Sequence, residues 1–501
     1  MSPKLTARAA SLAALILLSS LLSSSATFAQ NAAATTTTTA ASAASKTEEH
    51  LRVMRLHTEA FNAANAEALK KFAAEHLSEQ ERHGQTPERV AESEMGFRLM
   101  VGAFDLYEVE RNTDTELTAT FKTRDEFPTF ARAFWKFDAS NPSLVTSRDL
   151  EQTDTPASAL GQKRTAEELA KEVDAKLSRL AAEDKFSGAA LIAKDGRPVW
   201  QKAYGYADRE SKTLNNLDTR FRLGSMNKMF TSVSIAQLVQ AGKLKYTDTI
   251  AQLLPDYPNK EAARKITVHQ LLTHTSGLGD IFGPEFRQKK DSLREIKDYL
   301  QLFVNKPLRF EPGTDFSYSN GGFIVLGLII EKVSGQNYYD YVRKHVYDVA
   351  GMKSSGSFAK DEKVPNLAVG YTRRDEDGKL TPNWDSLPWR GMSAGGGDST
   401  VGDLLRFAEA LRSHKLLNAE LTETVITGKH QPGPNANRKY AYGFEENFIS
   451  GHRIVGHGGG APGMNGMLDV LMDNGYTVVV LANLDPPAAQ SVASYISERL
   501  K

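Results

Sequence analysis

Segments with a strand pattern stand at both ends of the region from residue 165 to 501, and helical patterns fill the chain between them. Near its start, Gly188–Ala193 is small and apolar, and Val199–Tyr204 follows after a hairpin turn. Near its end, Met467–Met472 and Tyr476–Leu481 flank another turn. Strands this far apart can pair only if the two ends of the region meet. We therefore expect an α+β domain whose antiparallel sheet is assembled from both ends, with a helical subdomain between them.

The preceding region, residues 47–156, changes its apolar period along the chain. Apolar residues from Leu51 to Leu77 recur at helical spacing, and beyond Gly102 apolar and polar residues alternate as in antiparallel strands. Helices followed by a strand meander predict a small α+β domain, which resembles the nuclear-transport-factor-2-like cone fold in this pattern alone. The region shows no catalytic or metal-binding pattern. We expect surface positions for its four spread histidines, which are His50, His57, His76 and His83.

The N-terminus carries the pattern of an export signal. Lys4 and Arg8 precede an apolar run from Ala9 to Leu22, and small residues follow up to Ala29. The alternative is a membrane anchor, but the apolar run is shorter than the ~20 residues that a spanning helix needs. We expect a signal peptide over residues 1–29 and a periplasmic or extracellular protein without a stable membrane anchor. An Ala/Thr-rich spacer over 30–46 and a linker over 157–164 complete the predicted organisation.

Composition narrows the chemistry. The chain has 501 residues, a formal net charge of zero and no cysteine. A thiol nucleophile, a disulfide and a thiolate metal site are therefore excluded. The balanced charge makes nucleic acid an improbable partner, because nucleic-acid binding needs clustered basic residues. No metal-ligand or dinucleotide pattern is present, so we predict no cofactor.

Ser225 and Lys228 stand three positions apart at a predicted helix start. That spacing is one helical turn, so the hydroxyl and the amine share a face, and the free N–H groups of the first turn lie beside them. A serine needs a nearby base before it can attack a carbonyl. A desolvated lysine loses its proton more readily and could be that base. A serine and a lysine at this spacing also occur by chance, so the pair alone does not establish a catalytic site.

Tyr318-Ser319-Asn320 follows a turn and precedes an apolar helix, Phe323–Val333. A phenol with a pKa of about 10 is a poor base unless a cation lowers that pKa, and Lys228 would do so if it lay nearby. The alternative is a tyrosine that packs in the core and an asparagine that caps the helix.

A histidine followed by glycines, His457-Gly458-Gly459-Gly460, lies next to a strand pattern. The formal Gly-x-Gly-x-x-Gly from Gly458 to Gly463 is not followed by a helix, so a dinucleotide site is rejected. The glycines favour a ligand that lies against the backbone. The alternative for His457 is a ring whose hydrogen bonds are satisfied in the core.

With these segments in this order, the chain resembles the serine β-lactamase-related superfamily over about residues 186–481. That family includes class C β-lactamases, D-alanyl-D-alanine carboxypeptidases, D-amino-acid peptidases and esterases. The resemblance implies a β-lactamase-like domain at residues 165–501. The other segments that carry it are Phe186-Ser187-Gly188, Lys194-Asp195-Gly196, Ala203–Ala207, Ile266–Leu278, Ser393–Gly396, Ser399-Thr400 and Asp403-Leu404.

The resemblance implies a role for each motif residue. Ser225 matches the acylated nucleophile, and Lys228 matches the amine that shares its proton. Tyr318 matches the general base, with its phenol kept acidic by Lys228. Asn320 matches the group that contacts the amide of the substrate.

The third motif departs from the β-lactamase pattern. His457-Gly458-Gly459 stands where class C β-lactamases have Lys-Thr-Gly, and the oxyanion hole would be formed by the backbone N–H groups of Ser225 and Gly460. A lysine there is a permanent cation, whereas a histidine with a pKa of about 6.5 is mostly neutral at pH 7. We therefore expect an esterase or peptidase rather than an efficient β-lactamase.

The sequence thus predicts an exported serine hydrolase that acts on a small-molecule or peptide substrate. The substrate would be an ester or an amide, with a D-amino-acid peptide as one candidate. The alternative is a catalytically silent, penicillin-binding-like module that binds or scaffolds. The segments 280–290 and 384–390 should set specificity, but the sequence specifies neither the natural substrate nor the oligomeric state.

Overall fold

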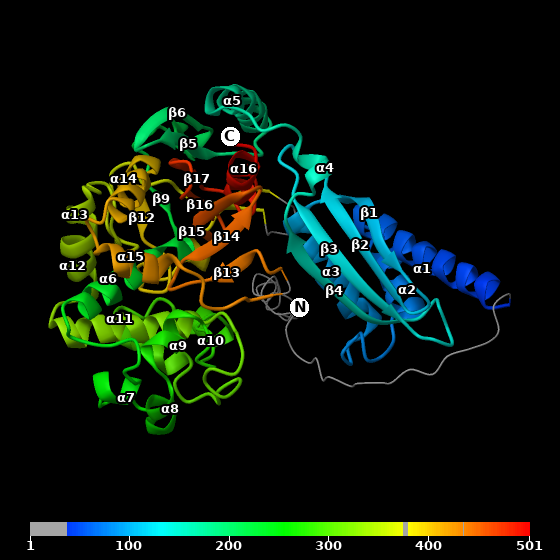
Figure 1. Ribbon diagram of the computed structural model, residues 1–501, viewed down its shortest axis with the longest axis horizontal. Coiled ribbons are helices and arrows are strands. Elements are labelled where there is room, and N and C mark those ends of the chain that lie inside the picture. The colour runs from blue at the N-terminus through cyan, green and yellow to red at the C-terminus, as the bar shows by residue number, and fades with distance from the viewer. Residues whose placement is uncertain (1–37, 374–378, 434) are drawn as a thin grey trace, which may run out of the picture. The chain divides into compact units, whose positions relative to one another are not determined.

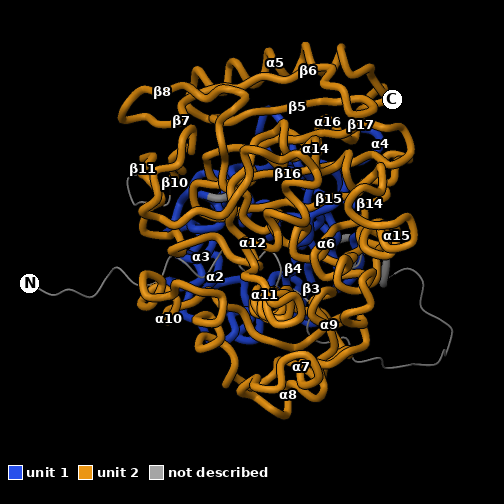
Figure 2. Tube along the Cα trace, turned by 90° about the vertical axis from the view of Figure 1, so that its left-hand side faces the viewer, with its two compact units in different colours: residues 1–159 blue, residues 160–501 orange. Residues whose placement is uncertain are grey.

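The chain folds as two units that meet in sequence inside the expected linker. The computed structural model describes residues 38–373, 379–433 and 435–501, and the chain divides into residues 1–159 and 160–501 (Figure 2). The predicted signal peptide lies outside the described residues. Helix α1 begins at Thr38, so residues 38–46 of the expected spacer belong to this helix. Alanine, the commonest residue of this stretch, has the highest helix propensity, which favours a helix here.

In the residues that the structure describes, the first unit has three helices followed by an antiparallel meander, which is the predicted order. Its four strands pair in sequence order, β1-β2-β3-β4. Leu117, Ala119 and Trp135 lie on the sheet face that packs against the helices and are almost fully buried. The likeness to the cone fold stays a prediction. The elements are α1 (Thr38–Asn62), α2 (Ala66–His76), α3 (Pro87–Val101), β1 (Phe104–Asn112), β2 (Glu116–Thr123), β3 (Phe130–Phe137) and β4 (Val145–Thr153).

Of the four histidines expected at the surface of this unit, His83 is exposed and His76 is half-buried, whereas His50 and His57 pack against aromatic rings of the interior. His50 has no exposed surface, and its ring stacks on Phe137 with a centroid distance of 3.9 Å. His57 Nε2 lies 2.6 Å from Glu94 Oε2. The surface prediction was wrong for both because one face of α1 packs against the sheet and α3, and these rings lie on that face.

The second unit contains a seven-stranded sheet in the order β13-β14-β15-β16-β17-β5-β6, antiparallel throughout (Figure 1). The strand from the start of the unit pairs with the one from its end, since Gly188 lies opposite Ala482 and Lys194 opposite Tyr476. The predicted assembly of the sheet from both ends of the region is confirmed. The strands are β5 (Gly188–Lys194), β6 (Arg197–Tyr204), β13 (Arg438–Tyr440), β14 (Glu445–Ile449), β15 (His452–Ala461), β16 (Met464–Leu471) and β17 (Tyr476–Ala482).

Helices cover both faces of this sheet. α16 (Ala488–Ser497) packs on β16 and β17, and α5 (Ala166–Ala182) packs on β6 and α16 (Figure 1). α14 (Val401–Arg412) packs on β5 and β17 from the other side. Coverage on both faces explains why residues 478–482 read as an unbroken apolar run rather than an alternating one.

The helical subdomain is built around two buried helices, α6 (Asn227–Gln240) and α11 (Asn320–Ser334), which pack on each other. The remaining helices and strands of the described chain are short. They are α4 (Ala157–Leu160), β7 (Tyr206–Asp208), β8 (Thr213–Leu214), β9 (Phe221–Arg222), η2 (Gly224–Met226), α7 (Ile250–Leu253), α8 (Lys260–Lys265), α9 (Val268–Leu272), α10 (Pro284–Lys289), η3 (Ile296–Leu302), α12 (Tyr338–Val342), η4 (Arg343–Tyr347), α13 (Asp348–Ala350), β10 (Tyr371–Thr372), β11 (Thr381–Pro382), η5 (Trp384–Ser386), β12 (Asp398–Ser399) and α15 (Ala419–Ile426).

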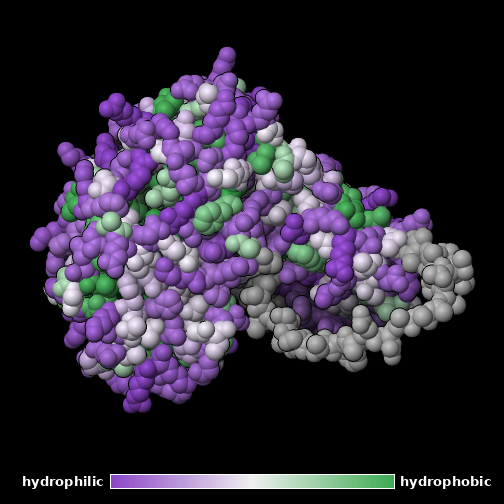
Figure 3. Space-filling model, viewed as in Figure 1, coloured by the Kyte–Doolittle hydropathy of each residue, from purple (hydrophilic) through white to green (hydrophobic). Residues whose placement is uncertain are grey.

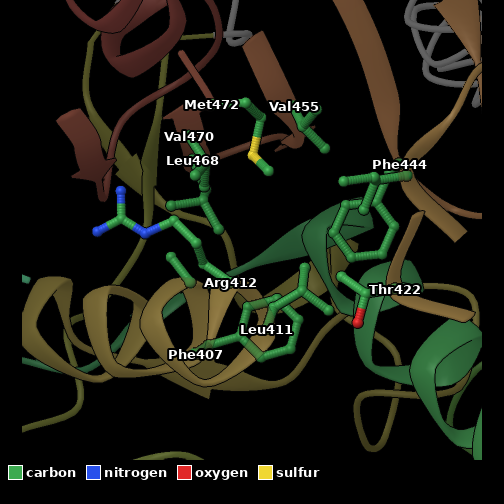
Figure 4. Close-up of a pocket in the computed structure, with 11 residues that line it drawn as sticks. Phe407, Leu411, Arg412, Thr422, Phe444, Val455, Leu468, Val470 and Met472 are labelled. Carbon is green, nitrogen blue, oxygen red and sulfur yellow. The ribbon is translucent and has the colours of Figure 1, made fainter. Parts of the chain in front are cut away.

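A small apolar void of about 10 Å³ lies in the core of the second unit, between α14, α15 and the sheet (Figure 4). Phe407, Leu411, Phe444 and Leu468 line it, and no predicted site residue does. A void this small and apolar is a packing defect rather than a ligand site. On the face in Figure 3, hydrophilic residues predominate and apolar residues are scattered, as on ordinary protein surfaces. Among the described residues, no helix is both long and apolar enough to cross a membrane.

Candidate active site

Ser225 lies in the 3-10 turn η2, directly before α6. The turn is pressed against β15, because a Cβ at Gly224 would lie 3.0 Å from Gly460 N. Gly224 also has a φ of +56°, a conformation that disfavours other residues. Ser225 remains partly exposed, whereas Gly224 and Met226 are buried. The turn therefore presents the serine hydroxyl at the surface of a tightly packed junction between helix and sheet.

Lys228 is fully buried one turn further along and points back at the serine. Its Nζ donates to Ser225 Oγ at 3.3 Å, to Asn320 Oδ1 at 2.7 Å and to the carbonyl oxygen of Ala394. It also lies 4.7 Å from the centre of the Tyr318 ring. These three contacts hold Nζ against the hydroxyl. An ammonium group would donate to all three partners, whereas a neutral amine donates to two of them and turns its lone pair toward the third.

Burial lowers the pKa of Lys228 from its ordinary 10.5 to about 7, and the Asp280 carboxylate opposes this drop. A large fraction of Lys228 is therefore neutral near pH 7, with a lone pair that can take a proton. The condition set by the sequence, a desolvated lysine beside the serine, is met.

Tyr318 approaches the serine from the loop before α11 and shares a hydrogen bond with it. Burial raises the pKa of the phenol well above its ordinary 10, and the hydrogen bond with Ser225 offsets only part of this rise. The expectation that Lys228 keeps the phenol acidic is wrong. Burial disfavours the charged form of both groups, so it keeps the phenol protonated and also lowers the charge of the lysine. Tyr318 is thus a neutral phenol that can relay a proton.

Asn320 begins α11 and links the lysine to a carboxylate. Its Oδ1 accepts from Lys228, and its Nδ2 donates to both carboxylate oxygens of Asp280, at 2.9 and 3.2 Å. The predicted contact with a substrate amide would have to replace or share one of these bonds. No sequence pattern indicated Asp280 as a partner of Asn320, although Asp280 lies in one of the segments expected to set specificity.

His457 lies on β15, is 3% exposed and has both ring nitrogens occupied. Nδ1 bonds to the carbonyl oxygen of Gly458, which can only accept, so Nδ1 carries the proton. Nε2, at 3.1 Å from the hydroxyl of Tyr440, is then the acceptor. Burial lowers the pKa of His457; Glu445 opposes this and Lys228 adds to it. The ring is neutral near pH 7.

The glycines after His457 make room for the nucleophile turn itself. A Cβ at Gly459 would lie 1.9 Å from the carbonyl oxygen of Leu223. The next peptide group is oriented by Asn465, whose Nδ2 donates to Gly459 O at 2.8 Å. In a trans peptide the N–H points opposite to the C=O, so the N–H of Gly460 points away from Asn465. Gly460 N also lies beside the turn of Ser225, since a Cβ at Gly224 would be 3.0 Å from it. This geometry suits the predicted oxyanion donor.

His274 is a supporting residue of the site. It is fully buried, its Nδ1 accepts from the backbone N–H of Ser319 at 3.1 Å, and its ring packs on Tyr318 at 4.2 Å. It therefore fixes the backbone between Tyr318 and Asn320. His269 instead bonds to Tyr442 at 2.7 Å, away from the site. In the described parts of the chain, no group of three or more acidic or histidine side chains is arranged to hold a metal ion.

Comparisons with known proteins match this unit. The sequence pattern of the family described as Beta-lactamase matches residues 173–500. PbpX of Bacillus subtilis (strain 168), which is named as a penicillin-binding protein, is 34% identical over 64% of this chain and 77% of its own. A penicillin binding protein of Bacillus halodurans, solved as a crystal structure, is 36% identical with a TM-score of 0.58, over 64% of this chain and 98% of its own. A D-stereospecific amidohydrolase of Streptomyces sp. is 26% identical with a TM-score of 0.57, over 66% and 98%.

Proposed function

The chain belongs to the beta-lactamase family, and we propose that it is an exported serine hydrolase that cleaves an ester or an amide through an acyl-enzyme on Ser225. One observation carries the proposal: a fully buried lysine whose pKa is lowered to about 7 donates a hydrogen bond to the hydroxyl of a partly exposed serine. A purely structural lysine gains nothing from such a position, because burying an ammonium group is unfavourable. This arrangement weighs against a catalytically silent module.

Acylation follows from the contacts. Ser225 Oγ attacks the carbonyl carbon while its proton passes to the neutral Nζ of Lys228, directly or through the hydroxyl of Tyr318. The negative charge that develops on the carbonyl oxygen is stabilised by the N–H groups of Ser225 and Gly460. The same proton then returns to the departing alcohol or amine. Water repeats the sequence on the acyl-enzyme, releases the acid and restores Ser225.

The charges around the site favour a substrate without a carboxylate near the scissile bond. His457 is neutral, and Asp280 places a negative charge beside Asn320. A carboxylate-bearing penicillin would therefore meet no permanent cation at the position of His457, and it would approach a carboxylate of like charge. We infer an esterase or amidase, and the likeness to a D-stereospecific amidohydrolase makes D-amino-acid amides the first amide substrates to test.

The proposal is tested by labelling and by hydrolysis of a small activated ester. Purified protein should hydrolyse p-nitrophenyl acetate, and a fluorophosphonate should add to Ser225, as located by mass spectrometry. Ser225→Ala should lose both signals, while Ser211→Ala, which removes an exposed serine, should keep them. No adduct with a fluorophosphonate or a penicillin would favour the binding module. Equal hydrolysis by the wild type and Ser225→Ala would refute the nucleophile.

Export is a separate part of the proposal and rests on the N-terminal sequence pattern. The protein recovered from the periplasm or medium should begin at Gln30, as read by N-terminal sequencing. Recovery of the full-length chain in the cytoplasm alone would refute export without affecting the enzyme assignment.

A further inference from the structure

Asp280 stands at the end of a hydrogen-bond chain that begins at the nucleophile. Ser225 Oγ bonds to Lys228 Nζ at 3.3 Å, and Nζ bonds to Asn320 Oδ1 at 2.7 Å. The other end of the same amide bonds to the Asp280 carboxylate, with its shorter distance at 2.9 Å. Only one side chain therefore separates the amine from a carboxylate.

The chemistry of the two partners fixes the orientation of the Asn320 amide. An amine or ammonium group that bonds to the amide must meet its oxygen, and a carboxylate can only accept, so it must meet the NH₂ group. Without Asp280, the amide could rotate and turn its NH₂ group toward Lys228. That rotation would remove the contact that holds Nζ near Ser225.

Asp280 is itself held rigidly. Its Oδ1 accepts from the backbone N–H of Phe282 at 3.0 Å. The preceding residue, Gly279, accepts from the Ser319 hydroxyl at 2.9 Å, and its carbonyl lies so close to α11 that a Cβ at Gly321 would be 2.5 Å away. The carboxylate is thus part of a packed junction between the loop after α9 and the start of α11.

We propose that Asp280 is a positioning residue for acylation: it orients Asn320 toward Lys228 and supplies the negative charge that faces the amine across that amide. The inference rests on the proposed function of Ser225 and Lys228, and it adds a residue that does not touch the reacting atoms.

The negative charge gives Asp280 an effect that packing alone would not have. Asp280 raises the pKa of Lys228, which burial lowers. Removing the charge should lower that pKa further, so that neutral lysine persists to more acidic pH. Several titratable groups on the surrounding elements interact with Lys228, namely Asp280, Tyr318, His274 and His457. Glu445 acts indirectly, because it affects the pKa of both Tyr318 and His457.

The experiment compares the pH dependence of kcat/KM for p-nitrophenyl acetate in the wild type, Asp280→Asn and Asp280→Ala. In Asp280→Asn the amide keeps an acceptor for Asn320 but loses the charge, so the acid limb should move to lower pH by about one unit while the plateau stays within about threefold. In Asp280→Ala the acceptor is also lost, and the plateau should fall about tenfold. Glu420→Gln, which neutralises an exposed carboxylate on α15, should leave the profile unchanged.

An acid limb that stays in place or moves to higher pH in Asp280→Asn would overturn the proposal, as would equal plateaus in Asp280→Asn and Asp280→Ala. If the wild-type protein showed no esterase activity, both the proposed function and this inference would be refuted. An active wild type whose limb does not respond to Asp280→Asn would remove only this inference.

Discussion

The neutral state of Lys228 can be tested by stability, without any substrate. Lys228→Met removes the titrating group but keeps a side chain of similar length in the buried site. In the folded wild type, the pKa of Lys228 is lowered from its ordinary 10.5 to about 7, and this shift corresponds to a free energy of about 5 kcal/mol. This is the free energy by which burying Lys228 destabilises the folded state below pH 7.

The sign follows from counting protons. Between pH 7 and 10.5, the unfolded chain carries a proton on Lys228 that the folded chain has lost, so the free energy of unfolding rises with pH in this window. Between pH 6 and pH 10 the wild type should therefore gain about 4 kcal/mol relative to Lys228→Met. The hydrogen bonds lost by Lys228→Met do not vary with pH, and the titration of groups that do not interact with Lys228 cancels in this difference.

Urea unfolding followed by tryptophan fluorescence measures this quantity. A Trp135→Phe background leaves Trp200, Trp384 and Trp389, which all lie in residues 160–501, so the signal reports that unit alone. Lys243→Met, at an exposed lysine beyond α6, is the matched control, and its difference from the wild type should not vary with pH. A difference for Lys228→Met that stays constant within about 1 kcal/mol would show that Lys228 remains an ammonium group, and the neutral-base mechanism would fail.

Three further predictions concern the neighbours of the serine. Asn465→Asp can no longer donate to Gly459 O, so kcat should fall about tenfold or more with little change in KM; an unchanged kcat would show that the peptide before Gly460 needs no such support. Gly459→Ala forces a Cβ against Leu223 O and should destabilise the protein by about 1–3 kcal/mol and abolish activity, whereas Gly283→Ala, with open space around it, should do neither in thermal and kinetic assays. Tyr318→Phe should lower kcat/KM about a hundredfold without moving the acid limb, and a moved limb would identify the phenol as the titrating group.

The sequence predicted what depends on local pattern and chain order. The pairing of β5 with β17 could be expected because strand patterns at both ends of the domain need partners. Ser225 and Lys228 could be expected to meet because a spacing of three positions places them on one helical turn. The sequence could not predict contacts that form only when distant segments are packed together in the folded protein. The bond from Asn320 to Asp280 joins residues 40 positions apart, and no periodicity signals it. The same holds for Gly459, whose lack of a side chain is explained by a carbonyl more than 200 residues earlier.

The raised pKa of Tyr318, which is opposite to the expected acidic phenol, shows which proton transfer the site supports. A base made of phenolate and ammonium requires that the phenol be the stronger acid of the pair. Here burial acts in the opposite direction on each group, since it penalises the charged form of both: it raises the pKa of the phenol and lowers that of the amine. The proton therefore resides on Tyr318, and above pH 7 the resting pair is a phenol beside a neutral amine. When Ser225 attacks, the amine is the group able to gain a proton, while the phenol can only pass one on. Lys228 is then the base whose titration should set the acid limb of activity, and Asp280, the carboxylate across Asn320, is the charge positioned to adjust it.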